Sequence, residues 1–230
     1  MSDDIIVLNT EELAKVQPTA TKVTVPVYSL VPEGSQILNE VLLEFDFSNP
    51  PINPNQFASS LVETCIKNNG LGLSASQCGF NYRVFVAGAG EEYVAYFNPK
   101  VISMSDKETI GLEGCLSFPN LFLNVLRPNW VKVEYQDYNG ETHTSQFEGM
   151  TARVFLHELD HMNGITFVHR TKPLALKSGI DKRNKLMHRL EKASKVLAKA
   201  KAFDVNYKSG AALTQVASNK PARKSAGRGR

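Results

Sequence analysis

Long hydrophobic runs are missing from this 230-residue chain. No stretch approaches the roughly 18 consecutive apolar residues that a membrane span requires, so we expect a soluble protein without membrane contact. The first residues include the acids Asp3 and Asp4 and form neither the basic leader of a signal peptide nor an Arg-rich transit peptide. The sequence therefore predicts a cytoplasmic protein.

Cysteine is also scarce, with three widely spaced residues, Cys65, Cys78 and Cys115. An odd number at such spacing is not a disulfide framework, and a reducing compartment would leave the thiols free for a metal or for catalysis. The 42% hydrophobic and 21% charged residues are typical of a globular domain. This composition excludes collagen-like, disulfide-stapled and wholly disordered chains.

Charge is distributed unevenly, although the formal net charge is only +3. Residues 171–230 hold 16 of the 26 Lys and Arg residues but 3 of the 23 acids, a net charge of +13, which leaves −10 for residues 1–170. The change in character predicts four parts along the chain. They are an N-terminal extension (1–24), a catalytic domain (25–170), a basic amphipathic helix (171–203) and a disordered basic tail (204–230).

Periodicity predicts helices and antiparallel strands inside the domain. Asn53-Pro54 is typical of a helix start, and apolar residues at four-residue spacing predict a helix over about 54–68. The Asn139-Gly140 turn predicts a hairpin over 130–146. Further strands are expected at 82–86 and 93–97, and further helices at about 152–162 and 179–201.

The strongest chemical signal is His157-Glu158-Leu159-Asp160-His161, an H-E-x-x-H pattern inside a predicted helix. Residues four apart lie on the same helix face, so both imidazoles can reach one metal ion. Glu158 is then placed to move a proton on a metal-activated water. A helix that merely happens to carry two histidines and an acid is the alternative for this pattern alone.

The third ligand separates the classes of metal hydrolase. Metzincin proteases would need a histidine where this chain has Phe167, so that class is disfavoured. A thermolysin-like protease would need a later acid, and only Asp181, Glu191 and Asp204 are available. Cys115 is a better candidate, because Cys, His and His leave the fourth position of a tetrahedral zinc or iron site open for water.

Three segments together resemble the peptide deformylase family: Gly70 to Gln77 (GLGLSASQ), Glu113 to Ser117 (EGCLS) and His157 to His161 (HELDH). The resemblance covers about residues 55–170 and includes Asn98-Pro99, Arg127-Pro128 and Ala152-Arg153. Two positions depart from the family pattern, with Ser74 in place of a usual alanine and Leu112 in place of a frequent acid. The implied fold is α+β, with mostly antiparallel β-sheets around a central helix that carries the H-E-x-x-H pattern.

The resemblance implies hydrolysis of the formyl group from the N-formylmethionine of nascent peptides. Cys115, His157 and His161 would hold one divalent ion, ferrous iron in the family, with zinc, nickel or cobalt as possible substitutes. Glu158 would move protons, while Gln77 and the backbone N–H of Leu116 would stabilise the oxyanion. The substrate groove is expected to involve four further residues: Leu71, Gly72, Glu113 and Val154.

Two other functions remain open from the sequence. One is a zinc endopeptidase that uses a later acid, and the other is a catalytically inactive scaffold whose basic tail binds ribosomal RNA. For the deformylase, the basic C-terminal helix is expected to contact the ribosome through phosphate groups. No motif carries this expectation, which rests on the charge of residues 171–230.

Overall fold

The structure is a computed structural model that describes residues 25–90 and 92–218, with side chains described as far as residue 200. It comprises two compact units, one ending at Ile180 and one beginning at Asp181. The expected extension 1–24 and residues 219–230 lie outside the described residues. The elements in chain order are η2 (Gln36–Asn39), α2 (Pro54–Lys67), β1 (Gly72–Ser74), η3 (Ala75–Cys78), β2 (Val84–Ala89), β3 (Glu92–Met104), β4 (Glu108–Cys115), β5 (Phe118–Pro128), β6 (Trp130–Gln136), β7 (Thr142–Glu148), α3 (Gly149–Met162), η4 (Phe167–Arg170) and α4 (Pro173–Ser218).

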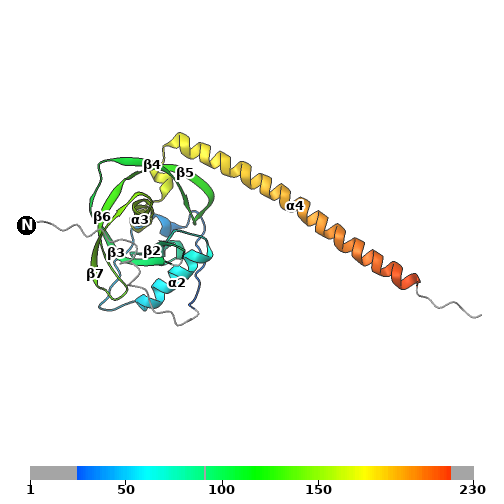
Figure 1. Ribbon diagram of the computed structural model, residues 1–230, viewed down its shortest axis with the longest axis horizontal. Coiled ribbons are helices and arrows are strands. Elements are labelled where there is room, and N and C mark those ends of the chain that lie inside the picture. The colour runs from blue at the N-terminus through cyan, green and yellow to red at the C-terminus, as the bar shows by residue number, and fades with distance from the viewer. Residues whose placement is uncertain (1–24, 91, 219–230) are drawn as a thin grey trace, which may run out of the picture. The chain divides into compact units, whose positions relative to one another are not determined.

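Two antiparallel sheets surround α3 in the first unit. Five strands pair in the order β1-β2-β3-β6-β7, and β4 pairs with β5 in a separate two-stranded sheet. Figure 1 shows α3 end-on between the β4–β5 pair and the larger sheet, with α2 beyond that sheet. The α+β fold expected from the sequence is therefore confirmed.

Side-chain alternation along β2 explains why the large sheet is covered on both faces. Phe85 packs among α3 residues, whereas Val84 and Val86 pack among α2 residues. Successive side chains of a strand point to opposite faces, so one strand contributes to two cores. The sheet thus fixes α3, which carries the H-E-x-x-H pattern, from one side while α2 supports the sheet from the other.

The start of α2 follows the predicted chemistry, and its end is capped by a left-handed residue. The Asn53 side chain accepts a hydrogen bond from the Gln56 N–H at 2.9 Å, with Pro54 at the first helical position. At the other end Asn69 has φ 55°, and the Gly70 N–H donates to the Cys65 carbonyl at 2.9 Å. The left-handed residue of this cap is therefore Asn69, and Gly70 follows it.

The sequence pattern did not reveal β4 and β5, although these strands carry Cys115. Their inward residues include the polar Glu113 and Arg127 beside the apolar Leu121, Leu123 and Val125, and their outward residues include the apolar Leu112 and Phe122. The usual alternation of apolar inward and polar outward residues is thus reversed at the polar inward and the apolar outward positions. These exceptions weaken the ordinary strand pattern in the sequence.

The C-terminal helix is longer than expected. It begins at Pro173 and continues to Ser218, so the backbone over residues 204–218 is helical where a disordered tail was expected. Ala211, Ala212 and Ala217 are good helix formers and favour this extension. Within the described part of the chain, no helix is long and apolar enough to cross a membrane.

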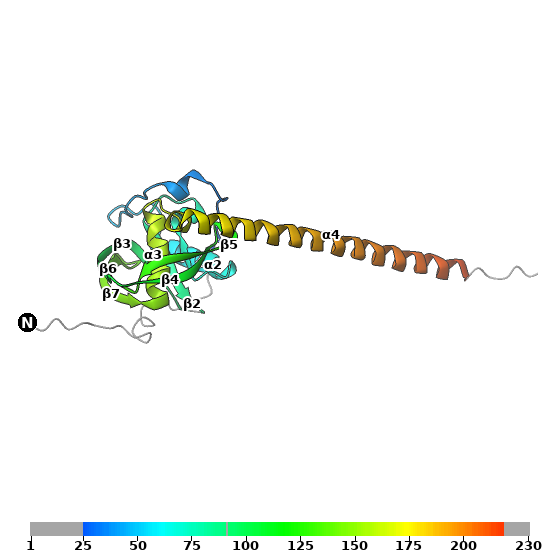
Figure 2. The ribbon, with the colours of Figure 1, turned by 90° about the horizontal axis from the view of Figure 1, so that it is seen from above.

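Asn98 ties the segment before α2 to the large sheet. Its side-chain amide donates to the Phe45 carbonyl at 2.9 Å and to Gln136 at 2.7 Å, and its oxygen accepts from the Phe45 N–H at 2.7 Å. Its φ of 50° is in the left-handed region, where Asn is more readily accommodated than most residues. Figure 2 shows the segment before α2, drawn in blue, along the outside of the unit.

We predict that Asn98→Gly lowers the free energy of unfolding by about 2–4 kcal/mol, because three hydrogen bonds are lost while the backbone angle remains allowed. Asn98→Ala should cost about 1 kcal/mol more, because Ala is strained at this angle. Urea unfolding of both variants measures the difference. An equal loss for Gly and Ala would contradict the contribution assigned to the backbone angle.

Candidate metal centre and substrate groove

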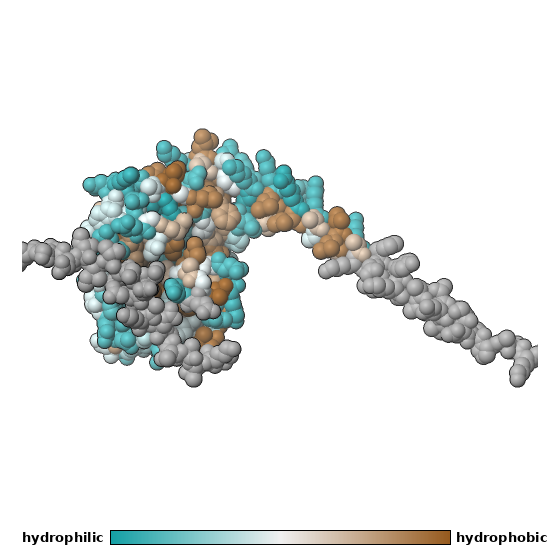
Figure 3. Space-filling model, viewed as in Figure 1, coloured by the Kyte–Doolittle hydropathy of each residue, from teal (hydrophilic) through white to brown (hydrophobic). Residues whose placement is uncertain are grey.

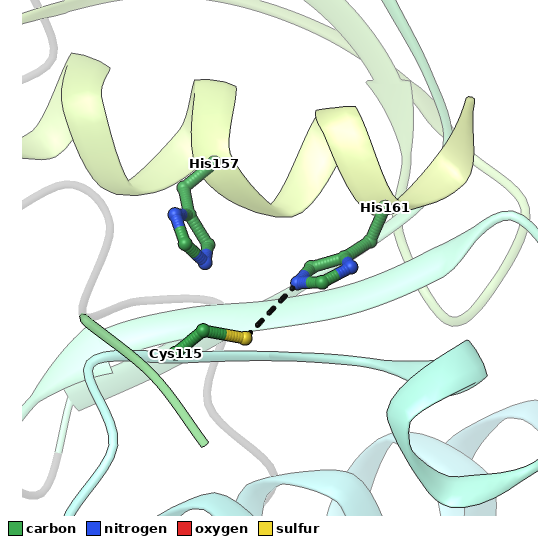
Figure 4. Close-up of side chains that lie close together, drawn as sticks. All are labelled: Cys115, His157 and His161. Carbon is green, nitrogen blue, oxygen red and sulfur yellow. Dashed lines mark hydrogen bonds between the residues drawn. The ribbon is translucent and has the colours of Figure 1, made fainter. Parts of the chain in front are cut away.

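Three candidate metal ligands converge from two elements. Cys115 ends β4, and His157 and His161 lie one helical turn apart on α3. One ligand atom from each residue lies within 4.8 Å of the other two. Figure 4 shows both imidazoles directed from the helix toward the cysteine sulfur, with Sγ 3.4 Å from His161 Nε2.

The separation of these atoms fits a shared ion. In a tetrahedral site with metal–sulfur and metal–nitrogen bonds of about 2.3 and 2.05 Å, sulfur and nitrogen lie about 3.6 Å apart. The observed 3.4 Å between Cys115 Sγ and His161 Nε2 agrees with this distance. The donor set of one thiolate and two imidazoles suits zinc or ferrous iron, so the residues fit a divalent metal ion.

Glu113 holds His157 in position. Its carboxylate lies 3.0 Å from His157 Nδ1, accepts two hydrogen bonds from Arg127 and accepts a third from Arg153. Burial alone would raise the pKa of Glu113, but the hydrogen bonds with His157 and Arg127 outweigh it and lower the pKa to about 2. The ionised carboxylate favours the tautomer with a proton on His157 Nδ1, which leaves Nε2 for the metal.

A chain of paired charges, buried except for the exposed Arg170, extends this support. Arg127 also pairs with Asp160, and Asp160 pairs with Arg170 from η4. Burying an unpaired charge would cost several kcal/mol. Each carboxylate in this chain contacts an arginine, which avoids that cost. The local sequence does not predict this role, although Arg127-Pro128 and Ala152-Arg153 are among the segments that resemble the family.

Glu158 lies beside the metal ligands in an enclosed position. Burial raises its pKa to about 7, with the charge of His157 acting in the opposite direction. Its Oε2 atom is buried and has no hydrogen-bond partner among the described residues. A Cβ at Gly72 would overlap Glu158 Oε1, so only glycine allows this close approach.

The orientation of Gln77 is determined by a capping box at η3. Its Oε1 accepts from the Ser74 N–H at 2.8 Å, so Nε2 points the other way. Nε2 lies 3.3 Å from Cys115 Sγ and 3.2 Å from Ser117 Oγ. Ser74 Oγ lies 2.9 Å from Ser76 Oγ, so this serine, in place of the usual alanine, hydrogen-bonds locally.

A cavity of about 590 Å³ opens beside these residues. Its lining includes every groove residue expected from the sequence, namely Leu71, Gly72, Glu113 and Val154, together with Gln77, Cys115, Leu116, His157 and Glu158. Glu113 differs from the expectation in one respect, because its carboxylate is engaged by His157 and two arginines. The structure thus brings all the predicted site residues except His161 to this cavity, and His161 lies next to it through Cys115.

The fold and this site define a metal-dependent hydrolase with an open groove. The family model for polypeptide deformylase matches residues 27–177. The chain belongs to the peptide deformylase family, whose enzymes hydrolyse the formyl group of formylated peptides.

Relatives and solved structures support the same family. The peptide deformylase of Thermotoga neapolitana is 43% identical over 113 residues, which is 49% of this chain and 69% of the relative. A Synechococcus elongatus peptide deformylase in complex with actinonin has a TM-score of 0.65 and 29% identity, over 74% of this chain and 92% of that one. A Met-Ala-Ser bound enzyme from Acinetobacter baumannii has a TM-score of 0.60 and 31% identity, over 63% and 98%.

We predict that Cys115→Ala lowers metal occupancy from about one ion per chain to a small fraction, because two imidazoles alone leave the site one ligand short. Cys78→Ala is the matched control. Burial raises the pKa of the Cys78 thiol to about 12, so it remains protonated and a poor ligand. Elemental analysis after dialysis measures both, and full occupancy in Cys115→Ala would remove this cysteine from the site.

Proposed function

We propose that this chain removes the formyl group from N-formylmethionyl peptides at the Cys115, His157 and His161 centre, with ferrous iron as the natural ion and zinc, nickel or cobalt as substitutes. The observation that carries the proposal is the convergence of these three ligands beside Glu158 in the groove. When bound, the ion supplies Lewis acidity and activates water at neutral pH.

Glu158 is proposed to move the proton of the reaction. It accepts a proton from the attacking water and delivers it to the amine nitrogen of methionine as the bond to the formyl carbon breaks. A buried carboxylate oxygen without a protein partner is available for this exchange. The close approach of Gly72 holds the carboxylate against the groove.

Gln77 and the Leu116 N–H are proposed to stabilise the formyl oxygen as negative charge develops on it. The two Nε2 hydrogens of Gln77 are directed at Cys115 and Ser117. One of these contacts must therefore be exchanged for the formyl oxygen. Ser117 is the easier contact to release, because its hydroxyl can rotate to another partner.

The groove is proposed to bind the peptide in an extended form. Leu71 and Val154 form walls of the methionine pocket, while Gly72 and Glu113 lie at its sides. The Met-Ala-Ser bound relative from Acinetobacter baumannii supports a peptide in this place. A free β4 edge among the described residues could pair with the backbone of such a peptide.

We predict that Glu158→Gln keeps the metal and the fold but lowers kcat on formyl-Met peptides by at least about 100-fold, since acid–base catalysis contributes at least this much. The partly exposed acid Glu63, which pairs with Lys67, gives a control, and Glu63→Gln should retain normal turnover. Steady-state kinetics with measured metal content decide the matter. Near-normal turnover of Glu158→Gln would exclude Glu158 from proton transfer.

Ribosome contact through the basic helix is a separate proposal. The exposed face of α4 carries many Lys and Arg residues, and nascent chains emerge at a surface rich in phosphate.

The cytoplasm is the proposed compartment, because the three cysteines are free and formylated nascent chains are the substrate. One relative, from rice, is named as a chloroplastic enzyme.

We predict that removal of residues 181–230 sharply lowers co-sedimentation with ribosomes at low salt while hydrolysis of short formyl peptides remains within about twofold of normal. The cut follows Ile180, because Leu176 and Ile180 pack against the Phe118 cluster and belong to the first unit. Raising the salt should release the full-length protein. Equal sedimentation of both proteins would contradict a docking role for α4.

A further inference from the structure

The outer face of the β4–β5 pair is apolar and exposed. Residues that pair across two strands point to the same face of the sheet. Ile110 pairs with Leu126, and Gly114 pairs with Phe122. Leu112 lies on the same face of β4, between Ile110 and Gly114. The exposed fractions are 67% for Ile110, 64% for Leu112, 59% for Phe122 and 49% for Leu126. Between residues 110 and 126, the outward residues of these two strands carry no charge, although the exposed Asn124, which pairs with Leu112, adds one polar side chain. Figure 3 shows hydrophobic surface in the region of these strands.

This apolar face is continuous with the catalytic groove. Leu112 and Phe122 belong both to the outer face and to the lining of the cavity, as does Gly114 between them. The Phe122 ring lies over Gly114, where a Cβ would come within 2.8 Å of Cε1. Exposed apolar patches of this kind commonly mark binding surfaces. A ligand that leaves the groove along β4 would therefore pass over Leu112 and then Ile110.

We propose that the β4–β5 outer face binds apolar side chains at the second and fourth positions of the formylated peptide and so selects nascent chains with an apolar start. The proposal rests on the proposed deformylase function. Side chains of an extended peptide alternate between two faces, so if methionine enters the pocket, residues two and four point outward. Their spacing along the peptide, about 6.6 Å, equals that of Leu112 and Ile110 along β4.

A second copy of this chain is a poorer occupant of the same face. Because Leu112 and Phe122 also line the cavity, a folded partner seated on them would cover the groove entrance. A peptide substrate uses both surfaces at once. The substrate is therefore the occupant that fits the shared residues best.

The test compares formyl tetrapeptides that differ in one position. The parent is formyl-Met-Ser-Ser-Ser, and three others carry a single Leu at position two, three or four. We expect Leu at position two or four to raise kcat/KM roughly fivefold, within the range that a partly buried apolar group supplies, and Leu at position three to raise it less than twofold. Equal gains at all three positions, or no gain, would overturn the proposal.

Variants of the face provide the second arm. Ile110→Thr, Leu112→Thr and Leu126→Thr combined remove apolar area but keep strand-forming residues, and should abolish the gains at positions two and four. Ile102→Thr, at a 52% exposed position on β3 outside the cavity, is the control and should keep them. Leu112→Glu should instead favour Lys at position two. Gains that survive in the triple variant would refute the assignment.

Binding of the unformylated peptides separates this inference from the proposed function. Calorimetry with Met-Leu-Ser-Leu and Met-Ser-Ser-Ser should show tighter binding of the first, whether or not formyl peptides are hydrolysed. Absence of hydrolysis with this binding preference retained would reject the proposed reaction but support the face. A dimer that the triple variant abolishes, with no peptide preference, would assign the face to self-association and overturn the inference.

Discussion

The buried carboxylate of Glu113 is the interaction on which the site depends. Glu113 lies on β4, and its carboxylate contacts His157 of α3. Arg127 of β5 and Arg153 of α3 neutralise its charge. The carboxylate therefore joins both strands of the small sheet to the helix. A buried unpaired carboxylate would be costly, and two arginines remove that cost. The same contacts orient the imidazole, which makes the charge network part of the metal site as well as of the fold.

Several elements were predictable because their signals are local. The Asn53-Pro54 start of α2 depends on one side chain and one fixed backbone angle, and the Asn139-Gly140 turn depends on two adjacent residues. The H-E-x-x-H pattern lies on one helix, so the meeting of His157 and His161 follows from helical periodicity. Each of these inferences needed no knowledge of tertiary structure.

Other features depend on residues distant in the chain and could not be predicted in this way. The partners of Arg127 lie at Glu113 and Asp160, and nothing in the local pattern indicates such pairs. The choice of Asn69 over Gly70 at the end of α2 is similar, because Gly70 is needed where Leu116 approaches. The need for a third metal ligand indicated Cys115, and family resemblance supplied Gln77, whereas the geometry of the capping box explains how Gln77 is oriented.

The separation of the metal ligands along the chain has a consequence for folding. Cys115 belongs to the β4–β5 pair and the two histidines belong to α3, so a bound ion forms a cross-link between two elements that close a loop of more than forty residues. A ligand that binds only the native state shifts the unfolding equilibrium in proportion to the logarithm of its concentration. The supply of the metal ion would therefore influence the abundance of the folded protein in addition to its turnover.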